Sequence, residues 1–187
     1  MIVEMGNRKS NDSDVVLVRQ IAGGDEAAFR ELYYRYNVPI FNFVLRIIHE
    51  PKEAEDILQE IFLAVWQGAC RYREKAQVKT WIYRIAHYKS ISWLRKHKPV
   101  TSFDDITDSE LDGPEQEAVA SWQLNDLKKA INHLSSKHRS VLELAFVQGM
   151  AYDEIAKVIG CPVGTVKSRM SYALKALNGK LKRVDFE

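Results

Sequence analysis

The chain has 187 residues, enough for one domain or for two small ones that each bury a core. Its composition, 46% hydrophobic and 28% charged, is that of an ordinary soluble globular protein and indicates no class of enzyme. No apolar run approaches the ~18 residues of a membrane span, and the first residues lack a signal-peptide core. We therefore expect a cytoplasmic protein that is not inserted into a membrane.

Charge is distributed unevenly along the chain, although the formal net charge is only +2. Residues 71–98 contain nine Lys or Arg and one acid, whereas residues 99–127 contain eight acids and no Lys or Arg. Residues 155–184 are basic again, with seven Lys or Arg and no acid. Two basic blocks thus flank an acidic one, and this order is more informative than the net charge.

Helical periodicity dominates the first half of the chain, after a polar start for which we expect disorder over residues 1–13. Apolar residues recur every three or four positions over residues 29–47, and His49-Glu50-Pro51 is typical of a helix end. A second apolar stripe spans residues 54–65, and a third helix is expected over residues 80–97. No segment alternates in the way that predicts a strand, so the expected fold class is all-α.

The acidic segment 99–117 divides the chain. It is poor in large apolar residues and is interrupted by two prolines and a glycine, which predicts a flexible linker. We expect it to join two small helical domains, over residues 14–98 and 118–187. The second domain should hold helices over 118–134 and 137–149 before a final helix pair. Free in solution, two domains so joined are able to fold against each other and hide their basic faces.

The final pair is "YDEIAKVIGCPVGTVKSRMSYALKAL", residues 152–177. Gly160 suits the left-handed position just past a helix end, Pro162 prevents that helix from continuing, and Thr165 is expected to cap the next one. This spacing predicts a helix-turn-helix, whose second helix presents basic and hydroxyl side chains to the major groove of DNA. The alternative is a helical hairpin with a solvated basic face. The candidate DNA-binding residues are Thr165, Lys167, Ser168, Arg169, Ser171, Tyr172 and Lys175.

Both halves resemble one known family. The stretch "LNDLKKAINHLSSKHRSVLELAFVQGMAYDEIAKVIGCPVGTVKSRMSYALKAL" resembles region 4 of the extracytoplasmic-function (ECF, group 4) sigma factors of bacterial RNA polymerase, in the sigma-70 family. The stretches "AFRELYYRY", "EAEDILQEIFLAVW" and "KTWIYRIAHYKSISWLRK" resemble region 2 of that family. The resemblance covers almost the whole chain outside its first dozen residues and the linker. It implies that region 2 binds core polymerase and reads and melts the −10 element of promoter DNA, and that region 4 reads the −35 duplex.

The resemblance assigns core-polymerase binding to an acidic face opposite the second apolar stripe. Such a face suits docking on a basic partner surface, although by itself it is also typical of a solvated helix. The candidate residues for binding core polymerase are Glu55, Asp56, Gln59 and Glu60. The resemblance also suggests a dedicated anti-sigma partner. The acidic linker, in the same family, threads through polymerase channels; here a solvated tether is an equally good interpretation.

The basic and aromatic block that follows suits single-stranded DNA, because cations follow phosphates and rings offer stacking platforms to unpaired bases. Trp81 is expected to pack in the core instead. The candidate residues for the melted −10 element are Arg73, Lys75, Lys79, Tyr83, Arg84, Tyr88, Lys89, Trp93, Arg95 and Lys96.

The chain departs from the family pattern at several of these positions. Tyr88 and Ser92 stand where region 2 commonly has Asn and Asp, so reading of the −10 element is expected to differ. Tyr172 and Leu174 stand where region 4 often has arginines, which leaves the preferred −35 sequence open. Ala151 replaces the usual hydroxyl cap of the preceding helix, a loss of about 1 kcal/mol.

An enzyme is not expected. The five histidines fall outside any paired metal spacing, and neither a Gly-rich phosphate loop nor a nucleophile elbow occurs, so no catalytic residue, metal or cofactor is predicted. Cys70 and Cys161 are expected to be reduced thiols. The main alternative function is a stand-alone helix-turn-helix transcriptional regulator, which would bind duplex DNA without polymerase. A second alternative is a sigma decoy, which would bind polymerase while its DNA contacts are dispensable.

Overall fold

The computed structural model describes residues 2–97 and 130–184, and the side chains of residues 12–97 and 130–178. The expected linker 99–117, and most of the helix expected over 118–134, lie outside these ranges. Within them every regular element is a helix, which confirms the all-α class.

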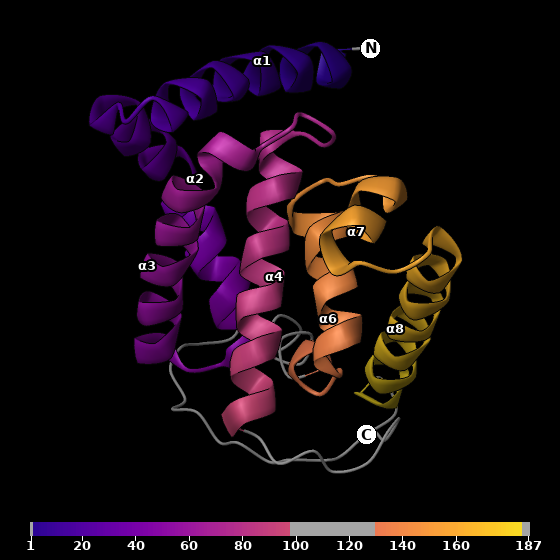
Figure 1. Cartoon of the computed structure of the whole chain (residues 1–187). Coiled ribbons are helices and arrows are strands. Elements are labelled where there is room, and N and C mark those ends of the chain that lie inside the picture. The colour runs from indigo at the N-terminus through magenta and orange to yellow at the C-terminus, as the bar shows by residue number, and fades with distance from the viewer. Residues whose placement is uncertain (1, 98–129, 185–187) are drawn as a thin grey trace, which may run out of the picture.

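The first half of the chain consists of four α-helices and one short 3₁₀ turn. α2 (Glu26–Ile48), α3 (Pro51–Gly68) and α4 (Val78–His97) pack side by side, and α1 (Ile2–Ala22) lies across one end of them (Figure 1). The 3₁₀ turn η1 (Ala69–Arg71) follows α3 and packs against α1.

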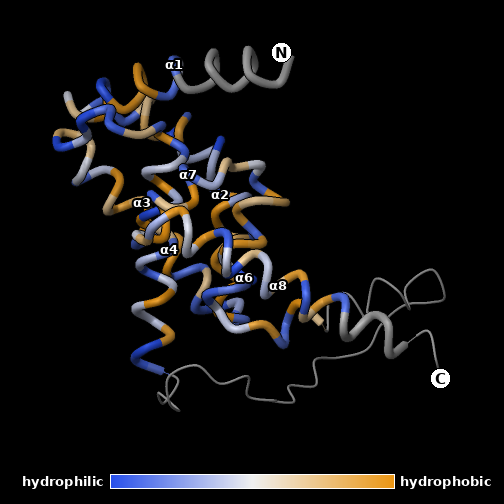
Figure 2. The backbone as a smooth tube through the Cα atoms, turned by 90° about the vertical axis from the view of Figure 1, so that its right-hand side faces the viewer, coloured by the Kyte–Doolittle hydropathy of each residue, from blue (hydrophilic) through white to orange (hydrophobic). Residues whose placement is uncertain are grey.

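The second half, within residues 130–184, continues with elements of very different length. α6 (Ser136–Leu142) runs directly into a π-helical turn, η2 (Glu143–Val147), and α7 (Tyr152–Ile159) and α8 (Val163–Val184) form the last pair. Figure 2 shows polar and apolar residues alternating along α8, as expected of a helix that buries one face.

α2 begins and ends where its local chemistry dictates. The Asp25 carboxylate accepts hydrogen bonds from the backbone N–H groups of Ala27 (2.8 Å) and Ala28 (3.1 Å), so the helix starts three residues before the apolar stripe. At its other end His49 adopts a left-handed conformation (φ 63°) and donates its N–H to the Leu45 carbonyl. The predicted end of this helix is therefore confirmed.

α1 differs from the expectation of a disordered terminus, because its helix begins at Ile2. Its later turns are fixed by packing: Leu17, Val18 and Ile21 are buried, and the buried Asp14 carboxylate accepts a hydrogen bond from the Tyr36 hydroxyl (2.5 Å). Once these turns are held, each further residue toward the N-terminus adds a hydrogen bond without a new nucleation cost.

The two halves of the chain pack against each other. α4 lies against α7, the end of α2 contacts α6, and buried apolar side chains of both halves form one continuous cluster. Polar contacts reinforce this seam: an Arg46 Nη1 lies 2.5 Å from a Glu143 carboxylate oxygen, and the Lys79 ammonium donates to the Gln148 carbonyl (2.7 Å). Arg139 of α6 is buried at the seam and donates to the Arg46 carbonyl at the end of α2 (2.9 Å).

Candidate nucleic-acid and polymerase interfaces

The helix-turn-helix forms as the sequence predicts, with one correction. Gly160 is left-handed (φ 68°), and its N–H donates to the Ala156 carbonyl at 2.9 Å. Thr165, however, does not cap α8. The helix begins at Val163, and the Pro162 carbonyl accepts from the N–H groups of Thr165 (2.9 Å) and Val166 (3.2 Å). Because proline fixes its own φ near the helical value, the helix begins three residues earlier than a Thr165 cap predicts.

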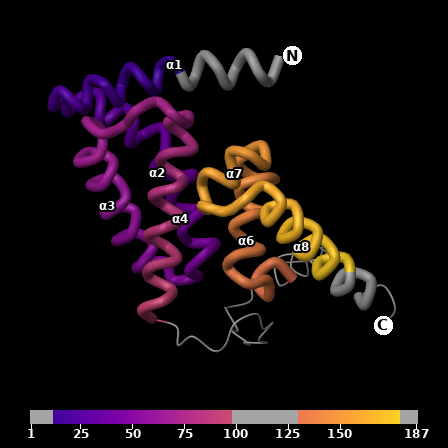
Figure 3. The backbone as a smooth tube through the Cα atoms, turned by 45° about the vertical axis from the view of Figure 1, so that its right-hand side comes forward, coloured from indigo at the N-terminus to yellow at the C-terminus, as the bar shows by residue number. Residues whose placement is uncertain are grey.

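α8 buries one face and exposes the other. Val166, Met170 and Ala173 are buried against α6 and α7, so the helix cannot rotate about its axis without losing this core. Figure 3 shows α8 extending outward from the rest of the molecule. Of the predicted DNA-binding residues, Thr165 and Arg169 are half-buried. The exposed ones are Lys167, Ser168, Ser171, Tyr172 and Lys175.

The predicted polymerase-binding residues share one exposed face. Glu55, Asp56, Gln59 and Glu60 are all exposed on α3, while Ile57 and Ile61 are buried on its other side. Glu60 accepts a hydrogen bond from the Lys89 ammonium of α4 at 2.8 Å. The acidic face and the basic block therefore adjoin along the α3–α4 contact, which sequence spacing alone did not indicate.

Most of the basic block is accessible. The Arg84 guanidinium lies 5.7 Å from the centroid of the Tyr88 ring, and Tyr88 itself is 51% exposed. Lys79 and Lys89 are half-buried, and burial lowers the pKa of Lys79. The exposed predicted residues of the block are Arg73, Lys75, Arg84, Tyr88, Arg95 and Lys96.

Tyr83 is the clear correction among the predicted DNA contacts. It is 0% exposed, and its ring packs edge-on against Phe43 with centroids 5.3 Å apart. Burial raises the pKa of the Tyr83 hydroxyl, which has no hydrogen-bond partner. Helical spacing explains the error, because Tyr83 shares a face with the buried Ala86 and Ser90 rather than with Arg84. In this arrangement Tyr83 cannot stack on a base.

The two tryptophans of α4 are held by neighbours within the first half. The Trp93 Nε1 donates to a Glu53 carboxylate oxygen of α3 (2.9 Å), and its ring stacks on His97. Trp81 packs on Tyr72 with ring centroids 5.0 Å apart, as expected of a core residue.

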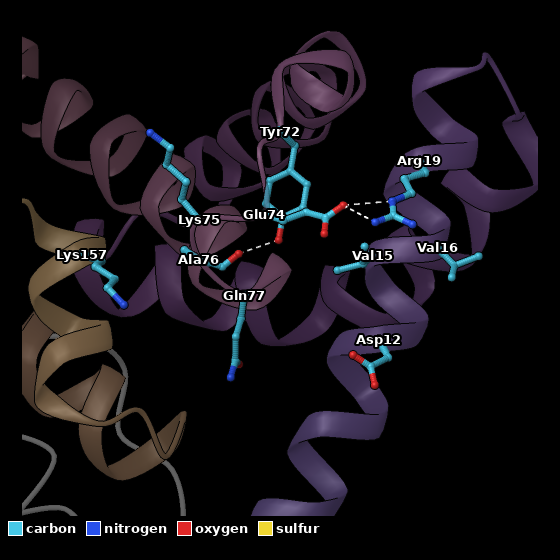
Figure 4. Close-up of a pocket in the computed structure, with 10 residues that line it drawn as sticks. All are labelled: Asp12, Val15, Val16, Arg19, Tyr72, Glu74, Lys75, Ala76, Gln77 and Lys157. Atoms are coloured by element: carbon cyan, nitrogen blue, oxygen red, sulfur yellow. Dashed lines mark hydrogen bonds and ion pairs between the residues drawn. The ribbon is translucent and has the colours of Figure 1, made fainter.

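A groove lies beside the segment that connects η1 to α4. Arg19 of α1 and Glu74 form an ion pair across it at 2.6 Å, and Lys75 and Lys157 line it as well (Figure 4). Lys157 comes from α7, so both halves contribute to the groove. No local pattern in the sequence joins residues so distant along the chain, and the sequence predictions included neither Arg19 nor Lys157.

The described residues can be compared with the requirements of a metal site and of a membrane span. Among the side chains that the structure describes, those of residues 12–97 and 130–178, no group of three His, Cys, Asp or Glu is placed to hold a metal ion. None of the helices described there is both long and apolar enough to span a bilayer.

The chain thus has two helical halves. The first carries adjoining acidic and basic faces, and the second ends in a helix-turn-helix. This combination is typical of a DNA-binding protein with two separate contact surfaces. Comparisons with known families agree: the model for sigma-70 region 2 matches residues 32–100, and the model for sigma-70 region 4 matches residues 124–177. The chain is 30% identical over 181 residues to the ECF RNA polymerase sigma factor SigW of Bacillus subtilis, covering 88% of this chain and 95% of that one. It is 29% identical over 184 residues to the RNA polymerase sigma-H factor of Pseudomonas aeruginosa, covering 92% and 95%.

Solved structures show the same fold. CnrH in complex with the cytosolic domain of CnrY superposes with a TM-score of 0.69 at 22% identity, covering 91% of this chain and 98% of that one. The sigma factor RpoE of Bartonella quintana, in complex with the anti-sigma factor NepR, gives 0.64 at 27% identity, covering 82% and 96%. The chain belongs to the ECF sigma factors of the sigma-70 family, and it is a sigma factor of RNA polymerase. A stand-alone regulator is not favoured, because the first half also matches.

Proposed function

We propose that the chain docks on core RNA polymerase through the acidic face of α3, receives the melted −10 strand on α4, and reads the −35 duplex with α8. The observation that carries the proposal is the placement of these three surfaces: each is exposed, and each lies opposite a buried stripe that fixes its orientation. We assign residues 14–98 to region 2, 99–117 to a linker and 118–187 to region 4.

Each surface has its own physical role. The carboxylates of Glu55, Asp56 and Glu60 offer an acidic docking face to a basic partner. The exposed cations of α4 follow the phosphates of the melted strand, and the exposed Tyr88 ring is offered to unpaired bases. Trp93 would first have to give up its stack on His97. On α8, Lys167 and the hydroxyls of Ser168 and Ser171 face the major groove. The polymerase performs the chemistry of transcription, so the chain itself is not a catalyst, and it acts in the cytoplasm.

An anti-sigma partner is part of the proposal. CnrH and the Bartonella factor are both seen bound to other proteins, and the partner of the latter is an anti-sigma factor. We infer that this chain is likewise held inactive by a dedicated anti-sigma factor until a signal releases it.

The test is reconstituted transcription. Purified chain is added to core polymerase, and specific transcripts are counted from a pool of promoters. Asp56→Asn should weaken assembly with core polymerase, and Lys167→Ala should leave assembly intact and reduce use of the −35 element about fivefold or more. Glu26→Gln, an exposed acid on α2, is the matched control for lost charge. Failure of the unmodified chain to join the core enzyme or to start specific transcripts would overturn the proposal.

A further inference from the structure

The recognition helix holds one aromatic side chain against the rest of its domain. The Tyr172 ring of α8 stacks on the imidazole of His138, from α6, with centroids 4.7 Å apart and planes inclined by 20°. Tyr172 nevertheless remains 45% exposed, beside the exposed Ser171 and Lys175. One face of the ring is therefore covered while the side chain stays on the outward surface of α8.

The His138 imidazole is held by Ser135, which stands at a position where serine usually caps a helix. Ser135 occupies the N-cap position of α6, where a serine hydroxyl ordinarily accepts a backbone N–H of the first turn. No such cap bond forms here. The Ser135 Oγ lies 2.8 Å from His138 Nδ1 instead. The hydroxyl orients the ring that supports Tyr172, and the first turn of α6 gives up a capping interaction.

We propose that His138 is a positioning residue for promoter reading: it fixes the Tyr172 ring so that this side chain meets the edge of one base pair of the −35 element. The proposal deepens the assignment of α8 and rests on it. An unsupported tyrosine on a helix surface samples more than one rotamer and loses that freedom when it binds. The stack on His138 restricts the ring before DNA binds, so most of this entropy cost is already met. A ring or hydroxyl held in one place then distinguishes base edges that a mobile side chain would not.

The stack also explains how this chain tolerates its departure from the family pattern. Region 4 often has an arginine where Tyr172 stands, and an arginine reaches guanine through its own hydrogen bonds. A tyrosine has a shorter polar reach, so its contribution to reading depends on where its ring is held. Ser135, His138 and Tyr172 thus form one supporting chain from α6 to the outward face of α8.

The experiment measures base preference at every −35 position with the whole chain bound to core polymerase and a promoter pool randomised in that element. Tyr172→Ala and His138→Ala should flatten preference at the same single position, where discrimination on the order of tenfold falls toward none. The double variant should be no worse than either single one. His138→Phe, which keeps an aromatic support, should retain most of the preference, and Lys137→Ala, an exposed neighbour on α6, should leave it unchanged. Tyr172→Phe separates a hydroxyl contact from a ring contact.

Several results would overturn the proposal. A loss in His138→Ala that is uniform across positions and accompanies a lower melting temperature would mean that the residue only stabilises the domain. Unchanged preferences in Tyr172→Ala would mean that the stacked ring does no reading. Lys167→Ala distinguishes the reading role of α8 from the positioning role of His138. If this variant also leaves use of the −35 element unchanged, α8 is not the reading helix. If only Lys167→Ala reduces that use, the result contradicts the role of His138 and leaves the role of α8 intact.

Discussion

At the scale of single residues, His87 shows how the contact between the halves controls a protonation state. It is 8% exposed on α4, its Nδ1 has no hydrogen-bond partner, and its ring meets Tyr88 edge-on. Burial, followed by the positive charge of Arg169 on α8, lowers the pKa of His87 to about 4. The imidazole is therefore neutral in the folded chain at neutral pH.

This pKa predicts a loss of stability in mild acid. The unfolded chain has a histidine pKa of about 6.5, so below that pH the unfolded state binds a proton that the folded state does not. Above about pH 6.5 His87 has no effect on the free energy of unfolding. As the pH falls toward 4, His87 lowers this free energy increasingly, by about 2 kcal/mol at pH 5. Urea unfolding at pH 7.5 and pH 5 measures it. His87→Gln should lose this part of the pH dependence, and an unchanged difference between the two pH values would contradict the assignment.

Tyr83 and Tyr88 show how far sequence reasoning reaches at this scale. The composition of residues 72–98 shows a basic and aromatic block, and from it we predicted that both tyrosines contact DNA. Their positions on α4 separate them: Tyr83 faces the core, while Tyr88 is exposed, and its hydroxyl lies over the Gly160 turn of the other half. The first distinction follows from helical spacing and was available from the sequence. The second depends on how the halves meet and was not.

At the scale of elements, apolar periodicity predicted α2, α3, α4 and the final helix pair. It failed for α1, whose apolar stripe is thin and whose order depends on packing against α2 and η1. It also failed for the π-helical turn Glu143–Val147, because no residue type there signals a change of helical pitch. Local patterns thus predict elements that bury a broad stripe, and tertiary contacts decide the others.

α7 has an incomplete cap that can be repaired. Ala151 occupies the N-cap position, and its N–H donates to the Glu154 carboxylate (3.0 Å), but its methyl group cannot accept in return. Ala151→Thr supplies the missing acceptor and should raise the free energy of unfolding by roughly 0.5–1 kcal/mol. Chemical denaturation measures the change. Ala151→Val, which has the same shape without the hydroxyl, is the control, and equal stabilisation by both would contradict the capping argument.

At the scale of the whole molecule, the sequence allowed two helical halves to fold against each other, but it did not indicate which residues form their seam. The sequence assigned no role to Arg139. In the structure it is only 7% exposed, and its Nη2 also donates to the Asn132 and Leu134 carbonyls of its own half (2.9 and 2.6 Å). Its guanidinium meets the carbonyl end of α2, where a cation is favourable. Three buried polar atoms near this seam lack a partner, the Arg139 Nε, the Tyr83 hydroxyl and the His87 Nδ1, and each such atom costs about 1–3 kcal/mol.

If α4 and α8 read the −10 and −35 elements as we propose, the closed arrangement, in which the two halves pack together, does not allow both elements to be read at once. Their names place the −10 and −35 elements about 25 base pairs apart, or roughly 85 Å along the duplex. In the closed molecule Arg169 of α8 is close enough to His87 of α4 to lower its pKa. The proposed reading surfaces of α4 and α8 therefore lie far closer together than about 85 Å while α4 packs on α7, and we expect the seam to open before both are used. The 32 residues between His97 and Ala130 have a covalent reach of at most about 110 Å, which is enough.

Weakening the seam should open the free molecule. Arg46→Gln removes the partner of the buried Glu143 carboxylate from the side of the first half, so it spares the fold of the second. Leaving that charged group without its partner costs on the order of 1–3 kcal/mol, which shifts the ratio of closed to open molecules about 5- to 150-fold. Small-angle X-ray scattering should show a larger radius of gyration for Arg46→Gln than for the unmodified chain. Arg30→Gln, an exposed arginine elsewhere on α2, should leave the radius unchanged. Arg139→Met should expand the molecule as well, and if both seam variants keep the compact radius while their helices remain intact, these polar contacts do not hold the halves together.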